Sequence, residues 1–99
     1  MGSRTPKRHL EDVQRRLTAA RESQRILEEQ VAVWNDALDD ARIRSLVSET
    51  PVQTQEYNEL SRHVLAANTE LQRRAADVRN LAAERDGLLR QWTPKDDDG

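Results

Sequence analysis

Apolar residues recur every three to four positions along nearly the whole chain, and a Thr-Pro pair at positions 50–51 interrupts them once. In the first stretch a seven-residue repeat places at position a Leu10, Leu17, Gln24, Val31, Leu38 and Ser45. The same repeat places at position d Val13, Ala20, Leu27, Trp34, Ala41 and Ser48. A heptad repeat sustained over this length predicts a coiled-coil helix rather than an ordinary surface helix.

The second stretch carries the same repeat. Position a holds Tyr57, Val64, Leu71, Val78, Arg85 and Trp92, and position d holds Leu60, Ala67, Arg74, Leu81 and Leu88. Threonine caps helix N-termini, and proline is favoured at the first helical position, so Thr5-Pro6 and Thr50-Pro51 indicate helix starts. Thr93-Pro94 indicates a stop, because proline disfavours the helical conformation of the residue before it. We therefore predict helices over 6–48 and 51–92 with a turn at 49–50.

Two helices joined by so short a turn must run antiparallel, so the predicted fold is all-α, a long antiparallel two-helix coiled-coil hairpin. A tight turn favours a register in which facing positions sum to about 98. This register pairs Leu27 with Leu71 and Gln24 with Arg74, and it places Trp34 against Val64 or Ala67. A register one heptad longer, with a sum of 105, remains open. Residues 1–5 are expected to be a flexible basic terminus, and 93–99 a disordered acidic tail.

The composition predicts that one hairpin alone is marginally stable. Hydrophobic residues make up 35% of the 99 residues, against about 45–50% in an ordinary globular domain. Polar residues also occupy the a and d positions at Gln24, Ser45, Arg74 and Arg85. We therefore expect a homo-oligomer, most simply a dimer that forms a four-helix bundle.

Some apolar residues lie outside the a and d positions and are candidates for contacts with a partner. Ile26, Val33 and Val47 all fall at position c of the first helix, and Ala37 falls at the neighbouring position g. These four residues are the predicted partner-binding residues, for a second copy of the chain or for another protein. Singly exposed apolar residues are common, so coincidence is the competing interpretation.

Candidate sites for chemistry are weak. Asp36, Asp39 and Asp40 share one helical face, but three acids on one helix leave most of a cation's shell to solvent. We interpret them as a solvated acidic face. His63 lies four residues after Glu59 and is interpreted as an ion-paired surface histidine. A two-helix hairpin offers no concave pocket for catalysis, so we expect no enzyme activity, no cofactor, no metal and no small-molecule substrate.

The charge distribution argues against nucleic acid as a partner. Basic doublets occur at Arg15-Arg16 and Arg73-Arg74, but acidic residues are interleaved throughout and the net charge is −2. No apolar run approaches the roughly 20 residues of a membrane span, so no membrane contact is expected. The chain has no cysteine and so forms no disulfide. We therefore expect it in the cytoplasm. Its arginine- and alanine-rich usage is typical of a high-GC bacterium.

The segment around the predicted turn resembles two kinds of bacterial protein. Glu56-Tyr57 is similar to the end of the tip motif in the Gre transcript-cleavage factors, whose hairpin enters RNA polymerase. Thr50 and Gln53 stand where that family has two acidic residues, so the resemblance implies binding without cleavage. Residues 48–51 (Ser-Glu-Thr-Pro) and 55–57 (Gln-Glu-Tyr) also resemble small uncharacterised actinobacterial coiled-coil proteins.

The hairpin shape is also similar to an anti-sigma factor family that binds cyclic di-GMP, but its Glu-x3-Ser motif has no copy here. The function expected from the sequence is therefore a non-enzymatic coiled-coil interaction or scaffold protein that acts through protein–protein contacts. The alternative is a transcription-regulatory hairpin that binds RNA polymerase or a sigma factor.

Overall fold

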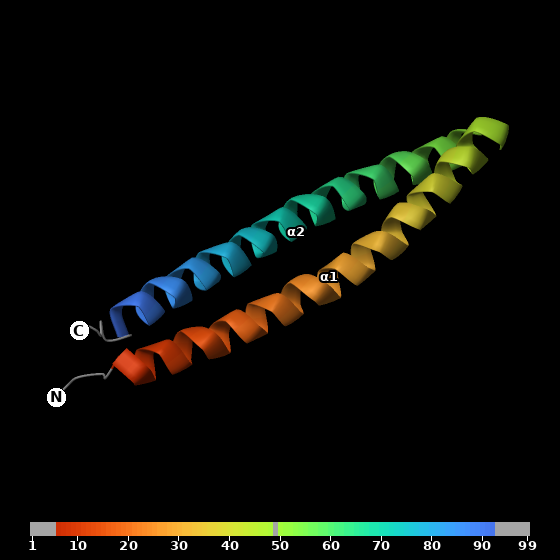
Figure 1. Cartoon of the computed structure of the whole chain (residues 1–99). Helices are drawn as coiled ribbons and strands as arrows, with labels where there is room; N and C mark the ends of the chain where they lie inside the picture. Colours follow the sequence, from red (N-terminus) through yellow and green to blue (C-terminus); the bar gives the residue numbers. More distant parts are fainter. Residues whose placement is uncertain (1–5, 49, 93–99) are drawn as a thin grey trace.

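The computed structural model describes residues 6–48 and 50–92, which form two helices in an all-α hairpin. Helix α1 covers Pro6–Ser48 and helix α2 covers Pro51–Trp92, as predicted. At 1.5 Å per residue each helix is about 60 Å long. The start of α1 and the end of α2 lie at one end of the hairpin, and the turn lies at the other (Figure 1). The predicted flexible terminus, the acidic tail and Glu49 of the turn lie outside the described residues.

The turn between the helices is held by the residue that the sequence marks as a cap. The backbone N–H of Gln53 donates to Oγ1 of Thr50 at 3.2 Å. The N–H of Thr54 donates to the carbonyl of Thr50 at 3.1 Å. A helix start leaves several N–H groups without an intrahelical acceptor, and the threonine side chain satisfies one of them. Thr50 is therefore confirmed as the N-cap of α2.

Removal of this cap is expected to destabilise the hairpin measurably. Replacing Thr50 with alanine removes the Oγ1 acceptor and should lower the free energy of unfolding by about 1 kcal/mol. Thr50→Ser keeps the acceptor and serves as the control, with a loss well below that of alanine. Urea unfolding followed by circular dichroism measures both changes. Equal losses in the two variants would show that the hydroxyl contributes nothing.

The seam of the hairpin, meaning the a and d positions of both helices, holds the core. Every described apolar side chain that is buried lies in the seam, namely Val13, Leu17, Leu27, Val31, Ala41, Val64 and Ala67. Leu27, Val31 and Ala67 form a central cluster, with Trp34 and Leu71 packed against it. The heptad assignment therefore identified the buried face of both helices correctly.

Contacts between the helices follow the shorter of the two registers. The rings of Trp34 and His63 lie 4.4 Å apart between centroids. A guanidinium N–H of Arg74 donates to the carbonyl of Ser23 at 3.1 Å, and the hydroxyls of Ser45 and Thr54 lie 3.4 Å apart. The residue numbers in these pairs sum to between 97 and 99. The register with a sum of about 98 is the one that forms.

Two polar side chains near the seam have partners other than those expected. His63 does not pair with Glu59. Its ring instead meets the indole of Trp34 edge-on at an interplanar angle of 76°, and Glu59 accepts a hydrogen bond from Gln55. Arg74 bonds to the backbone of Ser23 rather than to the neighbouring Gln24, because its side chain is long enough to reach across the seam to a carbonyl.

Candidate functional site

The four predicted partner-binding residues differ in exposure. Val33 is 65% exposed, Val47 is 78% exposed and Ile26 is 44% exposed. Ala37 is only half-buried at the edge of the seam. Three of the four side chains are thus available for contact, and Ala37 offers a smaller surface beside them.

These residues do not form one continuous stripe along α1. Position c between Val33 and Val47 is occupied by Asp40, which is exposed. Asp36 and Asp39 are exposed on the same side of the helix. The acidic residues therefore divide the predicted surface into a central part near Val33 and a distal part near Val47.

The distal part contains more exposed apolar residues than the sequence pattern at position c predicts. Three further exposed apolar residues lie within two helical turns of the hairpin turn, namely Ile43, Leu46 and Val52, with exposed fractions of 59%, 65% and 62%. Together with Val47 they form the tip cluster. Residues 43, 46 and 47 have the i, i+3, i+4 spacing that puts side chains on one helical face. This spacing among apolar residues outside the a and d positions was the sequence signal that could have identified the cluster.

The carboxylates of Asp36, Asp39 and Asp40 have no ion pair in the described part of the chain. Across residues 6–48 and 50–92, no group of three or more His, Cys, Asp or Glu side chains is arranged to hold a metal ion. The three aspartates form an exposed acidic surface next to the tip cluster.

The basic doublets, by contrast, are engaged with carboxylates. Arg15 and Arg16 both contact Asp12, at 2.8 and 3.6 Å. Arg73 and Arg74 both donate hydrogen bonds to Glu70. A guanidinium that already shares a carboxylate presents less net positive charge to a phosphate, so these doublets are not arranged as a basic patch.

Another arginine is held between two carboxylates on the outer side of α1. Arg25 donates to Glu22 and to Glu29, with N···O distances of 2.6 Å to each. The hydrogen bond from Arg25 lowers the pKa of Glu22, and the positive charge of Arg25 acts in the same direction. All three side chains are exposed, so their contacts order the surface without adding much stability.

The carboxyl group of Glu70 is expected to make the stability of the folded state depend on pH. Hydrogen bonds from Arg73 and then Arg74 hold its pKa below the ordinary value. A group with a lowered folded pKa stabilises the protein above its unfolded pKa, and that stability is lost as the pH falls through the folded pKa. The free energy of unfolding is expected to fall as the pH drops below about 5, and Glu70→Gln should flatten this dependence. Urea midpoints measured across that range would contradict the prediction if both proteins gave parallel slopes.

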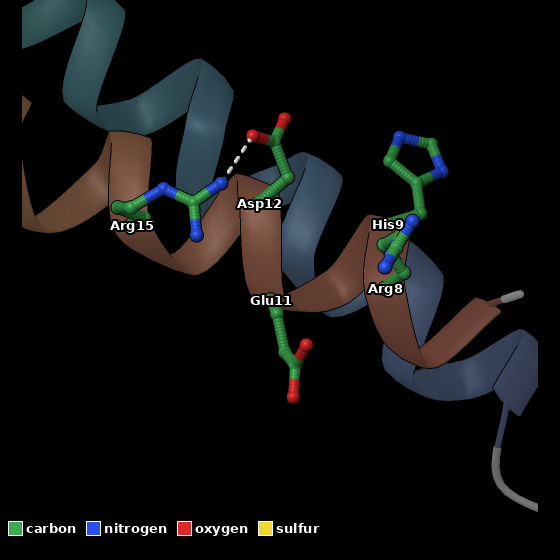
Figure 2. A pocket seen from close by; sticks show the side chains of 5 residues that line it. All are labelled: Arg8, His9, Glu11, Asp12 and Arg15. Atoms are coloured by element: carbon green, nitrogen blue, oxygen red, sulfur yellow. Dashed lines mark hydrogen bonds and ion pairs between the residues drawn. The ribbon is translucent and has the colours of Figure 1, made fainter. Parts of the chain in front are cut away.

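Several depressions lie on the described surface. One is lined by Arg8, His9, Glu11, Asp12 and Arg15, all from α1. Figure 2 shows Asp12 and Arg15 joined by a hydrogen bond on one side of the helix, with Glu11 pointing away from them. A second, of about 440 Å³, lies between the helices at their open end and includes Leu10, Arg85 and Leu89. Its lining confirms that the start of α1 and the end of α2 lie together.

Neither described helix has a stretch apolar enough to cross a membrane. Comparison of the chain with other proteins gave no match, whether to a protein-family model, to a curated protein or to a solved structure. The candidate functional surface therefore rests on the geometry of this hairpin alone. It consists of the central residues around Val33, the acidic surface and the tip cluster.

Proposed function

We propose that this chain is a non-enzymatic coiled-coil protein that acts through protein–protein contacts, beginning with a second copy of itself. The observation that carries the proposal is the distribution of apolar side chains. In the described part of the chain seven apolar residues are buried, whereas eight large apolar residues are exposed. An apolar side chain that becomes fully buried contributes about 1.5–3 kcal/mol, so covering part of this exposed set would add substantially to stability.

The central part of α1 is the proposed contact between two copies. Val33 and Ala37 are spaced i, i+4 and so lie side by side on the helix. Ile26 lies two turns before Val33, on the same side. Trp34 is only half-buried by the hairpin itself. A second hairpin packed here would form a four-helix bundle and would cover the remaining indole surface.

The test is the mass of the protein in solution. The unsubstituted chain is expected to sediment at about twice its 11.4 kDa chain mass. Val33→Glu should shift the equilibrium to monomer by placing a charge in the apolar contact. Val52→Glu is the matched control, because Val52 is 62% exposed against 65% for Val33. Val52 also lies in the first turn of α2, where a carboxylate is tolerated.

A well-folded monomer at micromolar concentration would refute self-association. Unfolding of Val33→Glu to the extent seen for a seam variant would instead show that Val33 belongs to the core. An unchanged mass in Val33→Glu would place the contact between copies elsewhere on the hairpin.

The tip cluster favours a second candidate function, a hairpin that binds RNA polymerase or a sigma factor through its end. In this candidate the protein would bind without cleaving transcripts, since Thr50 and Gln53 stand where the Gre family has two acidic residues. Capture of purified polymerase core or sigma factor by the chain, with loss of capture in Leu46→Gln, would support it. For both functions we propose that the protein acts in the cytoplasm of a bacterium. Neither function requires a cofactor.

A further inference from the structure

The outer face of α1 changes character abruptly from one heptad to the next. Asp36, Asp39 and Asp40 occupy consecutive f, b and c positions. The f, b and c positions seven residues further on hold Ile43, Leu46 and Val47. All six side chains are exposed and lie opposite the seam. One helical surface therefore presents an acidic half and an apolar half in series.

We propose that this surface, residues 36–47, binds an amphipathic helix of a partner protein with a basic flank. In this complex the apolar stripe of the partner packs on Ile43, Leu46 and Val47. Lysine or arginine side chains of the partner lie opposite the three aspartates. The inference rests on the proposed function only in that the chain acts through protein contacts, and it uses a surface apart from the central residues around Val33.

Charge complementarity identifies the partner as basic. Asp36, Asp39 and Asp40 have no ion pair within the described chain, so their charge is available to an incoming cation. Arg42 and Arg44 flank this surface, but at 100° per residue each points to one side, away from the direction of Ile43. Opposite charges across an interface raise the association rate and exclude acidic competitors.

A second copy of the chain fits this surface poorly. Parallel pairing of two such faces would set carboxylates against carboxylates. Antiparallel pairing centred on Ile43 would set Asp39 against Val47 and Asp40 against Leu46. Burying an ionised carboxylate against an apolar side chain is costly because the charge loses its hydration.

A lipid surface is a poorer fit as well. Anionic membranes attract clusters of lysine and arginine, whereas this surface carries three aspartates beside its apolar half against the two flanking arginines, Arg42 and Arg44. The surface spans 12 residues, about 18 Å or three helical turns. That length suits a helix of similar length and predicts a small interface of the kind found in transient complexes.

The test uses two synthetic helical peptides of about 18 residues, which is long enough for a helix to form. Both carry the same heptad-spaced leucines, with lysines at the remaining positions of one and glutamates at those of the other. Binding is measured by fluorescence anisotropy of the labelled peptide with the full chain. The Leu/Lys peptide is expected to bind about tenfold tighter or more, and this preference should shrink as NaCl rises from about 0.05 M to about 0.5 M.

Matched variants locate the binding surface. Leu46→Gln is expected to weaken binding of the Leu/Lys peptide to the chain about tenfold. Leu65→Gln is the control, because Leu65 is an equally large side chain with an exposed fraction of 69%, against 65% for Leu46. Its effect should stay within about twofold.

Charge variants test the acidic half. The triple variant Asp36→Asn, Asp39→Asn and Asp40→Asn should reduce the preference for the Leu/Lys peptide to about twofold. A control with the same change in net charge replaces three acids outside residues 36–47, namely Glu11→Gln, Glu28→Gln and Glu84→Gln. This control is expected to retain most of the preference, since exposed charges more than about 10 Å away are screened.

Several results would overturn the proposal. Equal binding of both peptides, or equal loss in Leu46→Gln and Leu65→Gln, would show non-specific adhesion. The surface would be assigned to lipid if the chain bound phosphatidylserine vesicles, lost this binding in Leu46→Gln, and showed no preference between the two peptides. A halved mass of Leu46→Gln would assign it to self-association. Self-association through the central residues is judged separately by the mass of Val33→Glu, so either proposal can fail alone.

Discussion

Replacing Leu17 with alanine is expected to lower the free energy of unfolding by about 2–5 kcal/mol. Leu17 is one of two large side chains with no exposed surface in the described chain. Its removal leaves a cavity in a seam that is only two helices thick. Few neighbouring side chains can move into such a cavity, so the loss should fall in the upper part of that range. Urea unfolding followed by circular dichroism provides the measurement.

The control for Leu17→Ala is Leu46→Ala, in which the same atoms are removed from an exposed position. Leu46 is 65% exposed, so the change should stay within about 0.5 kcal/mol. Similar losses in the two variants would contradict the structure, because they would mean that the seam and the tip bury leucine equally. A concentration-dependent loss in Leu46→Ala would instead indicate that the tip is covered by another copy.

Replacing Trp34 with alanine is expected to produce the second large loss. The indole packs against the cluster of Leu27, Val31 and Ala67, and it forms a T-shaped pair with the ring of His63. Full burial would predict a loss of about 3–5 kcal/mol. The hairpin itself buries Trp34 only in part, so about 2–3 kcal/mol is expected for an isolated hairpin. A dimer that covers the remaining indole surface would restore the larger value.

The ring contact is separated from the rest of this loss by a double-mutant cycle. Trp34→Ala, His63→Ala and the double variant are compared by urea unfolding at neutral pH. An edge-to-face ring pair predicts a coupling energy of about 0.5–1.5 kcal/mol. Additive losses would mean that the two rings touch without stabilising each other, and the energy of Trp34 would then come from the aliphatic cluster alone.

The sequence was sufficient to predict the architecture because the heptad repeat and the capping residues act locally. Val31 and Val64 are buried because both lie at position a of the heptad repeat. Residues spaced by this repeat lie on one side of a helix, and that side faces the other helix. Thr50 and Pro51 set the start of α2 through groups within four residues of one another. A short turn then leaves only the antiparallel arrangement and favours its shorter register. The sequence left the register with a sum of 105 open, and the contacts of Arg74 with Ser23 and of Trp34 with His63 decide between the two.

Side-chain contacts across the surface were predicted less well. Five Asp/Glu–Arg pairs in the sequence have i, i+4 spacing with the acid first, and all lie within the described ranges, namely Glu11–Arg15, Asp12–Arg16, Asp40–Arg44, Glu70–Arg74 and Asp86–Arg90. Only Asp12–Arg16 and Glu70–Arg74 form. Arg15 selects Asp12 rather than Glu11. Exposed arginines have several carboxylates within reach, and the energies of the alternatives differ by a few tenths of a kcal/mol. Sequence spacing alone therefore does not decide between them.

The candidate site was predicted only in part, and the reason differs from that for the ion pairs. Val33 and Val47 were identified by their shared heptad position, but that criterion treats every position c as equivalent. It passed over Asp40, which separates them, and it missed Ile43 and Leu46, which lie at other positions of the same outer face. The relevant pattern is two-dimensional, since neighbours on a helix surface come from three positions of the heptad at once.

The antiparallel arrangement also fixes how the hairpin responds to mechanical force. The start of α1 and the end of α2 lie at the same end (Figure 1), so a force applied to both would pull the helices apart sideways. The helices would then separate progressively, first at the open end where Leu10 and Leu89 line one depression, later at the central cluster, and last at Ser45 and Thr54 beside the turn. Because each step breaks only a few contacts, the hairpin is expected to lengthen gradually at low force, like a zipper. A force applied between the turn and the open end would instead run along both helices and would meet the stiffness of the paired rods.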